Sequence, residues 1–311
     1  MQKIKLLFLL IIVFISGCGS NKNDENKIKL ALDYTPNTNY IGVYVAKELG
    51  YYDEVGINVE LINSSSVSVE TLVNTNQADF GYSYSESILI ANQNDHHISS
   101  IYTLYNQNLS GFISQKDKNI TSINDFSNKT YCGWGDESEE KILKGLMKVN
   151  GVDPNSINIV NTDLTFATDV SNKCDIFWSY EGWGNIEAQI AGIEYNYIPL
   201  TSLNLNYYTP VIINNTQNIN PKTNEFVKAT NKGYVYAKNN IDQAVDIYMK
   251  HNPQDNKELI KQSLEVYAPY ISDTGYQDPQ IWNDFIKFCK ENEIITEYNN
   301  QGYTNEYVSN P

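Results

Sequence analysis

Arginine is absent from this chain of 311 residues, whose 22 basic side chains are all lysines. A guanidinium is the side chain best suited to hold a carboxylate, sulfonate or phosphate through two parallel hydrogen bonds, so no site here can bind an anion in that way. The 37 acidic residues give a formal net charge of −15. A surface with this charge and no basic stripe repels polyanions, so we expect no binding of nucleic acid.

Histidine is scarce as well, and its scarcity limits the possible catalytic chemistry. The histidines are His96, His97 and His251. There is no C-x-x-C pair, so a zinc site has little support. No serine lies in the G-x-S-x-G context that marks a hydrolase nucleophile. We therefore expect no metal, no cofactor and no catalytic residue.

Cysteine occurs four times, at Cys18, Cys132, Cys174 and Cys289. Cys18 belongs to the leader described below, and the three that remain cannot all pair within one chain. The fold can bring Cys132 and Cys174 together, but the sequence gives a disulfide between them little support.

Only one long apolar run occurs, the ten residues 6–15, which follow Lys3 and Lys5. A helix that spans a bilayer needs about 20 residues, so this run is too short to cross one. A short apolar run behind basic residues is typical of a secretory signal peptide.

The end of this run has the pattern of a lipoprotein signal. Residues 15–18 read Ile-Ser-Gly-Cys, which resembles the lipobox of bacterial lipoproteins. We expect residues 1–17 to be removed and Cys18 to carry the lipid, which anchors the protein to the extracytoplasmic face of the cell membrane. The polar residues 18–27 are then a flexible tether.

What the chain does contain is a regular succession of strands and helices. Residues 28–32 predict a buried strand and residues 40–49 a helix that Gly50 can end. The turn between them carries Asp33, Tyr34, Asn37 and Asn39, at the kind of position where α/β sheets bind ligands. An ordinary polar loop remains the alternative explanation for this stretch.

Three further segments place polar or aromatic side chains beside predicted strand ends or helix starts. Residues 78–82 predict a strand that precedes Tyr84 and Glu86, and residues 175–178 predict one that precedes Tyr180 and Glu181. A third segment has Trp134 between two glycines. Because the chain contains 24 tyrosines, any single aromatic side chain also has core packing as an explanation, and we assign three tryptophans to the core: Trp178, Trp183 and Trp282.

The strand–helix pattern starts again near Gly111, which predicts two α/β lobes with a ligand cleft between them. We expect residues 28–107 together with 208–311 to form the first lobe, which includes four C-terminal helices. Residues 108–207 are expected to form the second lobe. The fold class is therefore α/β, with a mostly parallel sheet flanked by helices in each lobe.

Several of these stretches, in this order, resemble one protein family. They are LALDYTPNTNYIGVYVAKELGYYDEVGINVEL from residue 30, GWGDESEEKIL, DIFWSYEGW, YYTPV and QDPQIW. They resemble the solute-binding proteins of ABC importers, in the branch that binds thiamin pyrimidine precursors. The resemblance runs from about Ile28 to Trp282. It differs at Tyr34, where tryptophan is more common in the family, and at Tyr40, where histidine is more common.

The resemblance implies a type II periplasmic-binding-protein fold whose lobes close over a small heteroaromatic ligand. The ligand would be an aminopyrimidine of the hydroxymethylpyrimidine or formylaminopyrimidine type, delivered by a monomer to an ABC permease and its ATPase. Glu181 would accept from the exocyclic amine, with Glu86 as a second candidate. Asn37 would bond a ring edge, and Tyr34 with Tyr180 or Trp134 would stack on the ring.

Other functions stay open at this point. A riboflavin carrier would also use an aromatic lining, while a sulfonate, taurine or nitrate carrier would need a cationic site that the composition disfavours. The same branch includes pyrimidine synthases, enzymes with a lysine and a histidine after the third strand and a cysteine-rich segment. Residues 79–87 contain neither lysine nor histidine and the chain has no cysteine-rich run, so we expect no enzyme.

Overall fold

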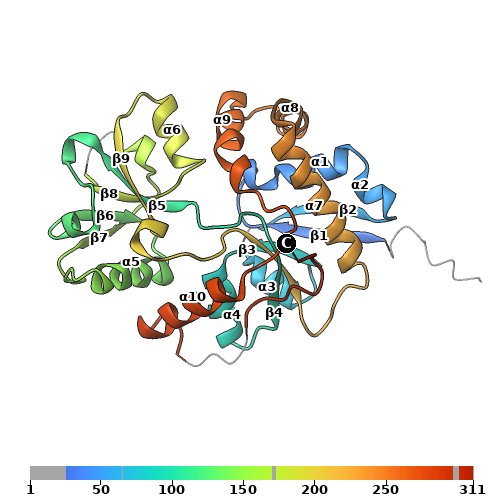
Figure 1. The fold of residues 1–311 in the computed structure, drawn as a ribbon, viewed down its shortest axis with the longest axis horizontal. Helices are drawn as coiled ribbons and strands as arrows, with labels where there is room; N and C mark the ends of the chain where they lie inside the picture. The colour runs from blue at the N-terminus through green and yellow to red at the C-terminus, as the bar shows by residue number, and fades with distance from the viewer. Residues whose placement is uncertain (1–25, 65, 170–172, 297–300, 311) are drawn as a thin grey trace, which may run out of the picture.

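The computed structural model describes residues 26–64, 66–169, 173–296 and 301–310 (Figure 1). The predicted signal peptide and Cys18 lie outside the described residues. None of the helices in the described part is long and apolar enough to cross a membrane.

The first sheet has the strand order β2-β1-β3-β10-β4. These strands are β1 (Lys27–Leu32), β2 (Asn58–Asn63), β3 (Phe80–Ser83), β4 (Ile98–Thr103) and β10 (Val211–Asn215). β1 pairs in parallel with β2 and β3, whereas β10 runs antiparallel to both of its neighbours, β3 and β4. β3 and β4 are buried along their whole length, as expected for strands covered on both faces.

The second sheet repeats this plan in the order β7-β6-β8-β5-β9. Its strands are β5 (Ser110–Gln115), β6 (Thr130–Gly133), β7 (Asn158–Asn161), β8 (Ile176–Tyr180) and β9 (Tyr195–Pro199). Here β5 is the strand that runs antiparallel to its neighbours, β8 and β9. The predicted fold class is confirmed, with one antiparallel strand within each sheet.

Helices cover both faces of the first sheet, and we call this sheet with its helices the first lobe. On one side lie α1 (Ile41–Glu48), α2 (Tyr51–Glu54), α7 (Thr223–Asn239) and α8 (Ile241–His251). The other side carries α3 (Val69–Asn74) and α4 (Ser85–Gln93). The helix α1 ends at Glu48, one residue before the predicted end, and Gly50 adopts the left-handed conformation with φ of 73°.

The second lobe consists of the second sheet with α5 (Glu137–Val149) and α6 (Gly184–Ile190). Asp136 caps α5 by accepting a hydrogen bond from the backbone N–H of Ser138 at 2.7 Å. The chain passes between the lobes twice, through residues 104–109 and residues 200–210. Such paired connections are the expected place for a hinge.

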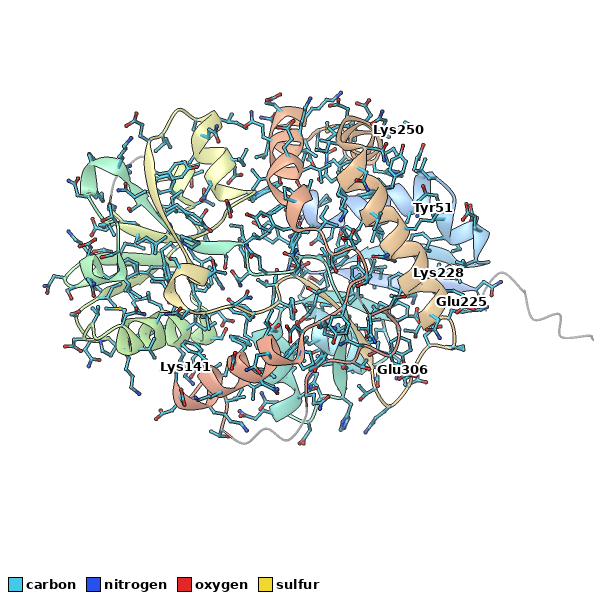
Figure 2. The ribbon with its side chains drawn as sticks, viewed as in Figure 1. Tyr51, Lys141, Glu225, Lys228, Lys250 and Glu306 are labelled. Atoms are coloured by element: carbon cyan, nitrogen blue, oxygen red, sulfur yellow. A yellow bond between two sulfur atoms is a disulfide. The ribbon has the colours of Figure 1, made fainter. Side chains whose placement is uncertain are left out.

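The last two helices, α9 (Lys257–Tyr267) and α10 (Pro279–Glu291), contact both lobes. The ring of Tyr267 lies directly against Gly182 in the second lobe. Beyond α10, the backbone oxygen of Glu293 accepts a hydrogen bond of 2.7 Å from Nζ of Lys141, which Figure 2 labels on α5. The C-terminal helices therefore hold the lobes together as well as covering the first one.

Short 3₁₀ turns complete the chain, and two details of the predicted boundaries are wrong. The turns are η1 (Thr38–Tyr40), η2 (Lys116–Lys118), η3 (Ile123–Phe126), η4 (Phe166–Thr168), η5 (Leu200–Leu203) and η6 (Ala268–Tyr270). The cap of α3 is Ser68, whose Oγ accepts from Thr71 N, not the polar run at residues 63–66. The strand expected at residues 207–211 begins only at Val211, because Pro210 has no backbone N–H to donate to a ladder.

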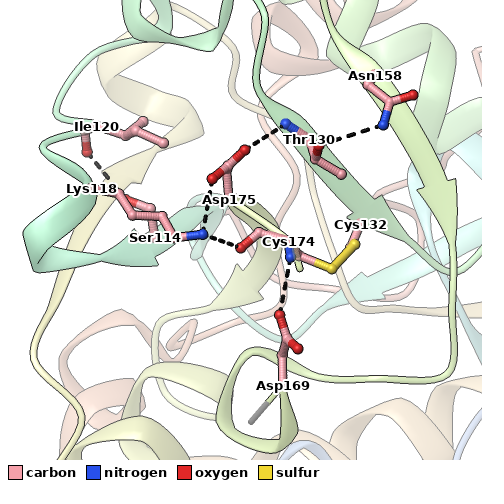
Figure 3. A network of polar contacts seen from close by, with 9 residues as sticks. All are labelled: Ser114, Lys118, Ile120, Thr130, Cys132, Asn158, Asp169, Cys174 and Asp175. Atoms are coloured by element: carbon pink, nitrogen blue, oxygen red, sulfur yellow. Dashed lines mark hydrogen bonds and ion pairs between the residues drawn. A yellow bond between two sulfur atoms is a disulfide. The ribbon is translucent and has the colours of Figure 1, made fainter. Parts of the chain in front are cut away.

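Cys132 and Cys174 form a disulfide, which the sequence argument gave little support (Figure 3). Cys132 lies on β6 and Cys174 precedes β8, its direct neighbour, so their Cα atoms lie 5.7 Å apart despite a separation of 42 residues. Nζ of Lys118 stabilises the segment that precedes β8 by donating to Cys174 O at 2.6 Å and to Asp175 Oδ1 at 2.9 Å. Long-range strand pairing thus decides a contact that cysteine spacing could not predict.

Candidate ligand-binding site

The turn after β1 is organised by Asp33. Its Oδ1 accepts a hydrogen bond of 2.7 Å from the hydroxyl of Tyr40, and its Oδ2 accepts one from the hydroxyl of Tyr84 at the start of α4. Burial raises the pKa of Asp33, and the hydrogen bonds from Tyr84 and Tyr40 oppose this rise. Tyr40 is fully buried and packs edge-on against Tyr82 at 4.7 Å, so the carboxylate is held by rigid partners.

The other predicted ligand residues of this turn have different surroundings. Tyr34 is 65% exposed. Asn37 uses its side chain locally, because its Oδ1 caps η1 by accepting from Asn39 N at 2.8 Å and its Nδ2 donates to Thr35 O at 3.0 Å. Asn39 accepts at Oδ1 from the hydroxyl of Tyr105 at 2.9 Å. The amides therefore shape the turn, and Tyr34 is the side chain left free to swing toward a ligand.

The carboxyl end of β3 places Tyr84 and Glu86 next to this turn. Among the hydrogen bonds of the described residues, none involves Glu86 Oε2, although this atom is buried. Burial raises the pKa of Glu86 to about 8; its own backbone N–H lowers it, and the nearby carboxylates of Asp136 and Glu70 raise it further. A buried, unpaired carboxyl is costly for the fold and marks a candidate functional group.

The carboxyl end of β8 brings Tyr180 to the same place from the second lobe. Burial raises the pKa of Tyr180, and the charges of Glu86 and Asp33 raise it further. Tyr180 acts on the pKa of Tyr84 in the same direction. We call these four residues, Asp33, Tyr84, Glu86 and Tyr180, the interlobe cluster.

Glu181 lies apart from this cluster. Its backbone N–H donates to Leu109 O at 2.8 Å, and burial raises the pKa of its carboxyl. That carboxylate in turn raises the pKa of Tyr197 and Tyr267, so it faces β9 and α9. The two glutamate side chains therefore have different neighbours. Glu86 belongs to the cluster, and Glu181 lies at its border, on the side of α9.

Trp134 is presented by a glycine loop at the end of β6. The ring is 57% exposed and meets the ring of Trp178 edge-on at 5.9 Å. Glu139 is buried beneath the loop and accepts at Oε2 from Trp134 N at 3.1 Å. A Cβ on Gly133 would lie 2.4 Å from Glu139 Oε1, so only glycine allows this clamp. Trp134 is thus held in an exposed position beside the cluster.

Two hollows are found on the surface of the described residues, and neither is lined by the interlobe cluster. One, of about 160 Å³, sits at the start of α5 and is lined in part by Asp136, Glu139 and Asn161. The other, of about 520 Å³, lies between α6 and α9. Each of the four cluster residues is partly buried.

The electrostatics of the cluster are one-sided. In the described part of the chain, no lysine is among the groups that shift the pKa of Asp33, Glu86 or Glu181. The described residues also contain no group of three or more side chains suited to hold a metal ion. What the arrangement can do is accept hydrogen bonds at carboxyl oxygens and stack tyrosine rings against a planar group.

Two residues near this candidate site were not selected as ligand residues from the sequence. Asp33 was only noted in the turn, and Trp178 was assigned to the core, against which its ring does pack, with Phe112 at 5.4 Å. Trp178 is only partly buried, and its Nε1 has no hydrogen-bond partner among the described residues. The signal was available for Trp178: it precedes Tyr180 by two residues on a strand, so both side chains project from the same face.

Comparison with known families and proteins identifies the family and the fold of the chain. Residues 37–244 match the family described as NMT1/THI5 like. The chain is 21% identical over 317 residues to the formylaminopyrimidine-binding protein of Halalkalibacterium halodurans, covering 96% of both chains. It is 22% identical over 297 residues to the 4-amino-5-hydroxymethyl-2-methylpyrimidine phosphate synthase of Legionella pneumophila, covering 91% of this chain and 93% of the relative.

Solved structures share the fold at lower identity. The alkanesulfonate-binding protein SsuA of Xanthomonas axonopodis pv. citri, bound to MOPS, superposes with a TM-score of 0.66 at 8% identity, covering 88% of this chain and 95% of SsuA. The Candida albicans CA3427 gene product, described as having the generic periplasmic binding protein fold, gives 0.65 at 16% identity, with 92% and 98% covered. Because the matching region spans more than half of the chain, the protein belongs to the NMT1/THI5 like family and has a type II periplasmic-binding-protein fold.

Proposed function

We propose that the protein is the extracytoplasmic solute-binding component of an ABC importer, and that its lobes close over a thiamin-related aminopyrimidine. The family, the two-lobed fold and the paired connections between the lobes support a binding function. The residues 28–107 with 208–311 and the residues 108–207 would move as the two lobes, with the hinge in the connections.

The interlobe cluster is the observation that carries the ligand class. Its acceptors are the carboxyls of Asp33 and Glu86, with Glu181 at its border, and no cation neutralises them in the described part of the structure. A ligand that brings N–H donors favours the ionised form of these carboxyls and then makes charge-assisted hydrogen bonds to them, whereas an anion disfavours their ionisation. An aminopyrimidine has both the donors and the flat ring that the tyrosines suit.

The ring would stack between Tyr34 and either Tyr180 or Trp134, which border the cluster from the two lobes. Its exocyclic amine would bond a glutamate, and the burial of Glu86 makes this residue a stronger candidate than Glu181. Asn37 and Asn39 would contribute chiefly by shaping the turn, since their side chains already bond Thr35, Asn39 and Tyr105.

The competing ligands fit this site less well. Sulfonate, taurine and nitrate need cationic or neutral N–H donors, which the cluster does not offer among its described side chains. A riboflavin carrier shares the aromatic lining and is separated from a pyrimidine carrier only by binding measurements.

A pyrimidine-forming enzyme is the rival of another class, because a synthase and a binding protein are equally similar to this chain. The absence of lysine and histidine from residues 79–87 argues for binding without catalysis. Covalent capture or consumption of pyridoxal phosphate by the purified protein would support the enzyme instead.

The proposed location is the outer face of the cell membrane, with a lipid on Cys18, the permease and its ATPase as partners, and a monomeric state. The disulfide between Cys132 and Cys174 supports it, since disulfides persist in oxidising compartments outside the cytosol. Metabolic labelling with a radioactive fatty acid, compared with a Cys18→Ala variant, tests the anchor.

A thermal-shift screen of residues 18–311 against aminopyrimidines, flavins, sulfonates and nitrate tests the ligand. A ligand at 100 times its dissociation constant stabilises the folded state by about 2.7 kcal/mol, a readily measured shift. We expect a response to hydroxymethylpyrimidine or formylaminopyrimidine. A response to taurine or nitrate alone would contradict the proposal.

A further inference from the structure

Two buried polar atoms of opposite hydrogen-bonding character are left unpaired where the lobes meet. One is Glu86 Oε2 on α4, and the other is Trp178 Nε1 on β8; within the described residues neither has a partner. An indole N–H can only donate, and a carboxylate oxygen accepts. Native proteins pair nearly all of their buried polar atoms, so two unpaired ones at one junction call for an explanation.

The residues around these atoms place Glu86 in the interlobe cluster and Trp178 on the face of β8 that carries Tyr180 of the same cluster. Trp178 and Tyr180 project from one face of β8, and Tyr180 lies close enough to Glu86 for the carboxylate to raise its pKa. On the other side, the ring of Trp178 meets that of Trp134, two residues before Asp136, whose charge reaches Glu86. The first lobe thus contributes the acceptor and the second lobe the donor.

The surroundings of Glu86 offer it no cationic partner. The groups that face it are Glu70 on α3, Asp136 before α5, Tyr180 on β8, Tyr207 in the second connection and Cys289 on α10. None of these described groups is a cation, and Tyr207 and Cys289 are buried beside it. A molecule that enters between the lobes with an N–H or O–H group can pair Oε2 and favour the ionised carboxylate.

We propose that Glu86 Oε2 and Trp178 Nε1 are the two polar ends of the ligand slot: the ligand donates to Glu86 and accepts from Trp178. This inference rests on the proposed function and makes its ligand class narrower. The ligand must carry a donor on one edge and an acceptor on another, as an aminopyrimidine does with its amine and its ring nitrogens or hydroxymethyl oxygen. Oxyanions such as nitrate lack the donor, and fully protonated polyamines lack the acceptor.

The test is isothermal titration of 4-amino-5-hydroxymethyl-2-methylpyrimidine into residues 18–311 of the wild type and of single variants. Glu86→Leu removes the acceptor and should weaken binding at least about tenfold, whereas Glu86→Gln keeps a neutral acceptor and should restore most of the affinity. Trp178→Phe keeps a ring but removes the donor, and should weaken binding about three- to tenfold.

Trp282→Phe is the matched control, because Nε1 of this buried tryptophan already donates to Gln277 Oε1 at 3.1 Å. It should leave the affinity unchanged, and circular dichroism of each variant shows whether it is folded. A wild type that does not bind the pyrimidine overturns both this inference and the proposed ligand. Binding by the wild type with equal affinity in Glu86→Leu and Trp178→Phe overturns the inference alone.

Discussion

Replacing Glu86 by glutamine should change how the stability of the protein depends on pH. The side chains have the same shape, but glutamine cannot ionise. Burial raises the pKa of Glu86 to about 8, above the ordinary 4.5 of a glutamate in an unfolded chain. The folded protein therefore keeps this proton to higher pH than the unfolded chain does.

The sign and size of the effect follow from that difference. Because the folded-state pKa is raised, the contribution of Glu86 to stability is complete below pH 4.5 and is lost as the pH rises through about 8. One pKa unit corresponds to about 1.4 kcal/mol, so the wild type loses up to about 5 kcal/mol across this window. Glu86→Gln avoids this loss and should become progressively more stable than the wild type.

Urea unfolding followed by tryptophan fluorescence, at several pH values from 4.5 to 9, measures this difference. Carboxylates with lowered pKa values, such as Asp125 and Asp175, stabilise the fold less as the pH falls. Both proteins contain them, so their contribution cancels in the difference between the two free energies of unfolding. Glu306→Gln, at an exposed carboxylate, controls for the loss of one negative charge (Figure 2). A difference between wild type and Glu86→Gln that stays constant from pH 5 to 9 would refute the argument.

Two further predictions concern the frame of the site. Replacing both Cys132 and Cys174 by alanine should lower the free energy of unfolding by about 4 kcal/mol, because the disulfide closes a loop of 42 residues; urea unfolding without reductant measures this, and equal stability of the two proteins would contradict it. Gly182→Ala should cost about 1–3 kcal/mol, because its Cβ would lie 2.5 Å from the ring of Tyr267. Differential scanning calorimetry measures the change in melting temperature. An unaltered melting temperature would contradict the tight contact between Tyr267 of α9 and Gly182 of the second lobe.

Local sequence patterns were sufficient to predict most of the elements. β1, β3 and β8 lie within two residues of the strands predicted at residues 28–32, 78–82 and 175–178, and α10 begins with Pro279 behind the capping residue Asp278, as its local sequence indicates. These features depend on neighbours a few residues apart, through periodicity, capping and the fixed φ of proline. The restart of the pattern near Gly111 was likewise enough to predict two lobes.

The site was less predictable, because it depends on which side chains meet across the lobes. Sequence order put Glu86 and Glu181 on equivalent strand ends, and the resemblance favoured Glu181. In the folded chain Glu86 and Asp33 both lie close enough to Tyr180 to raise its pKa, while Glu181 acts on Tyr267 of α9. A shift of one residue at the end of a strand turns a side chain to the other face of the sheet. The sequence pattern does not show which of the two faces meets the opposite lobe.

The sequence by itself determined the acidic, arginine-free composition, the strands and helices, and the aromatic and carboxyl groups placed at strand ends. Only the tertiary structure decided how these groups are paired: the disulfide across neighbouring strands, the hydrogen bonds from tyrosines to Asp33, and the polar atoms of Glu86 and Trp178 that are left without partners among the described residues. Local elements form from interactions within a few residues, whereas burial, pairing and pKa are properties of groups that chain folding brings together from distant positions.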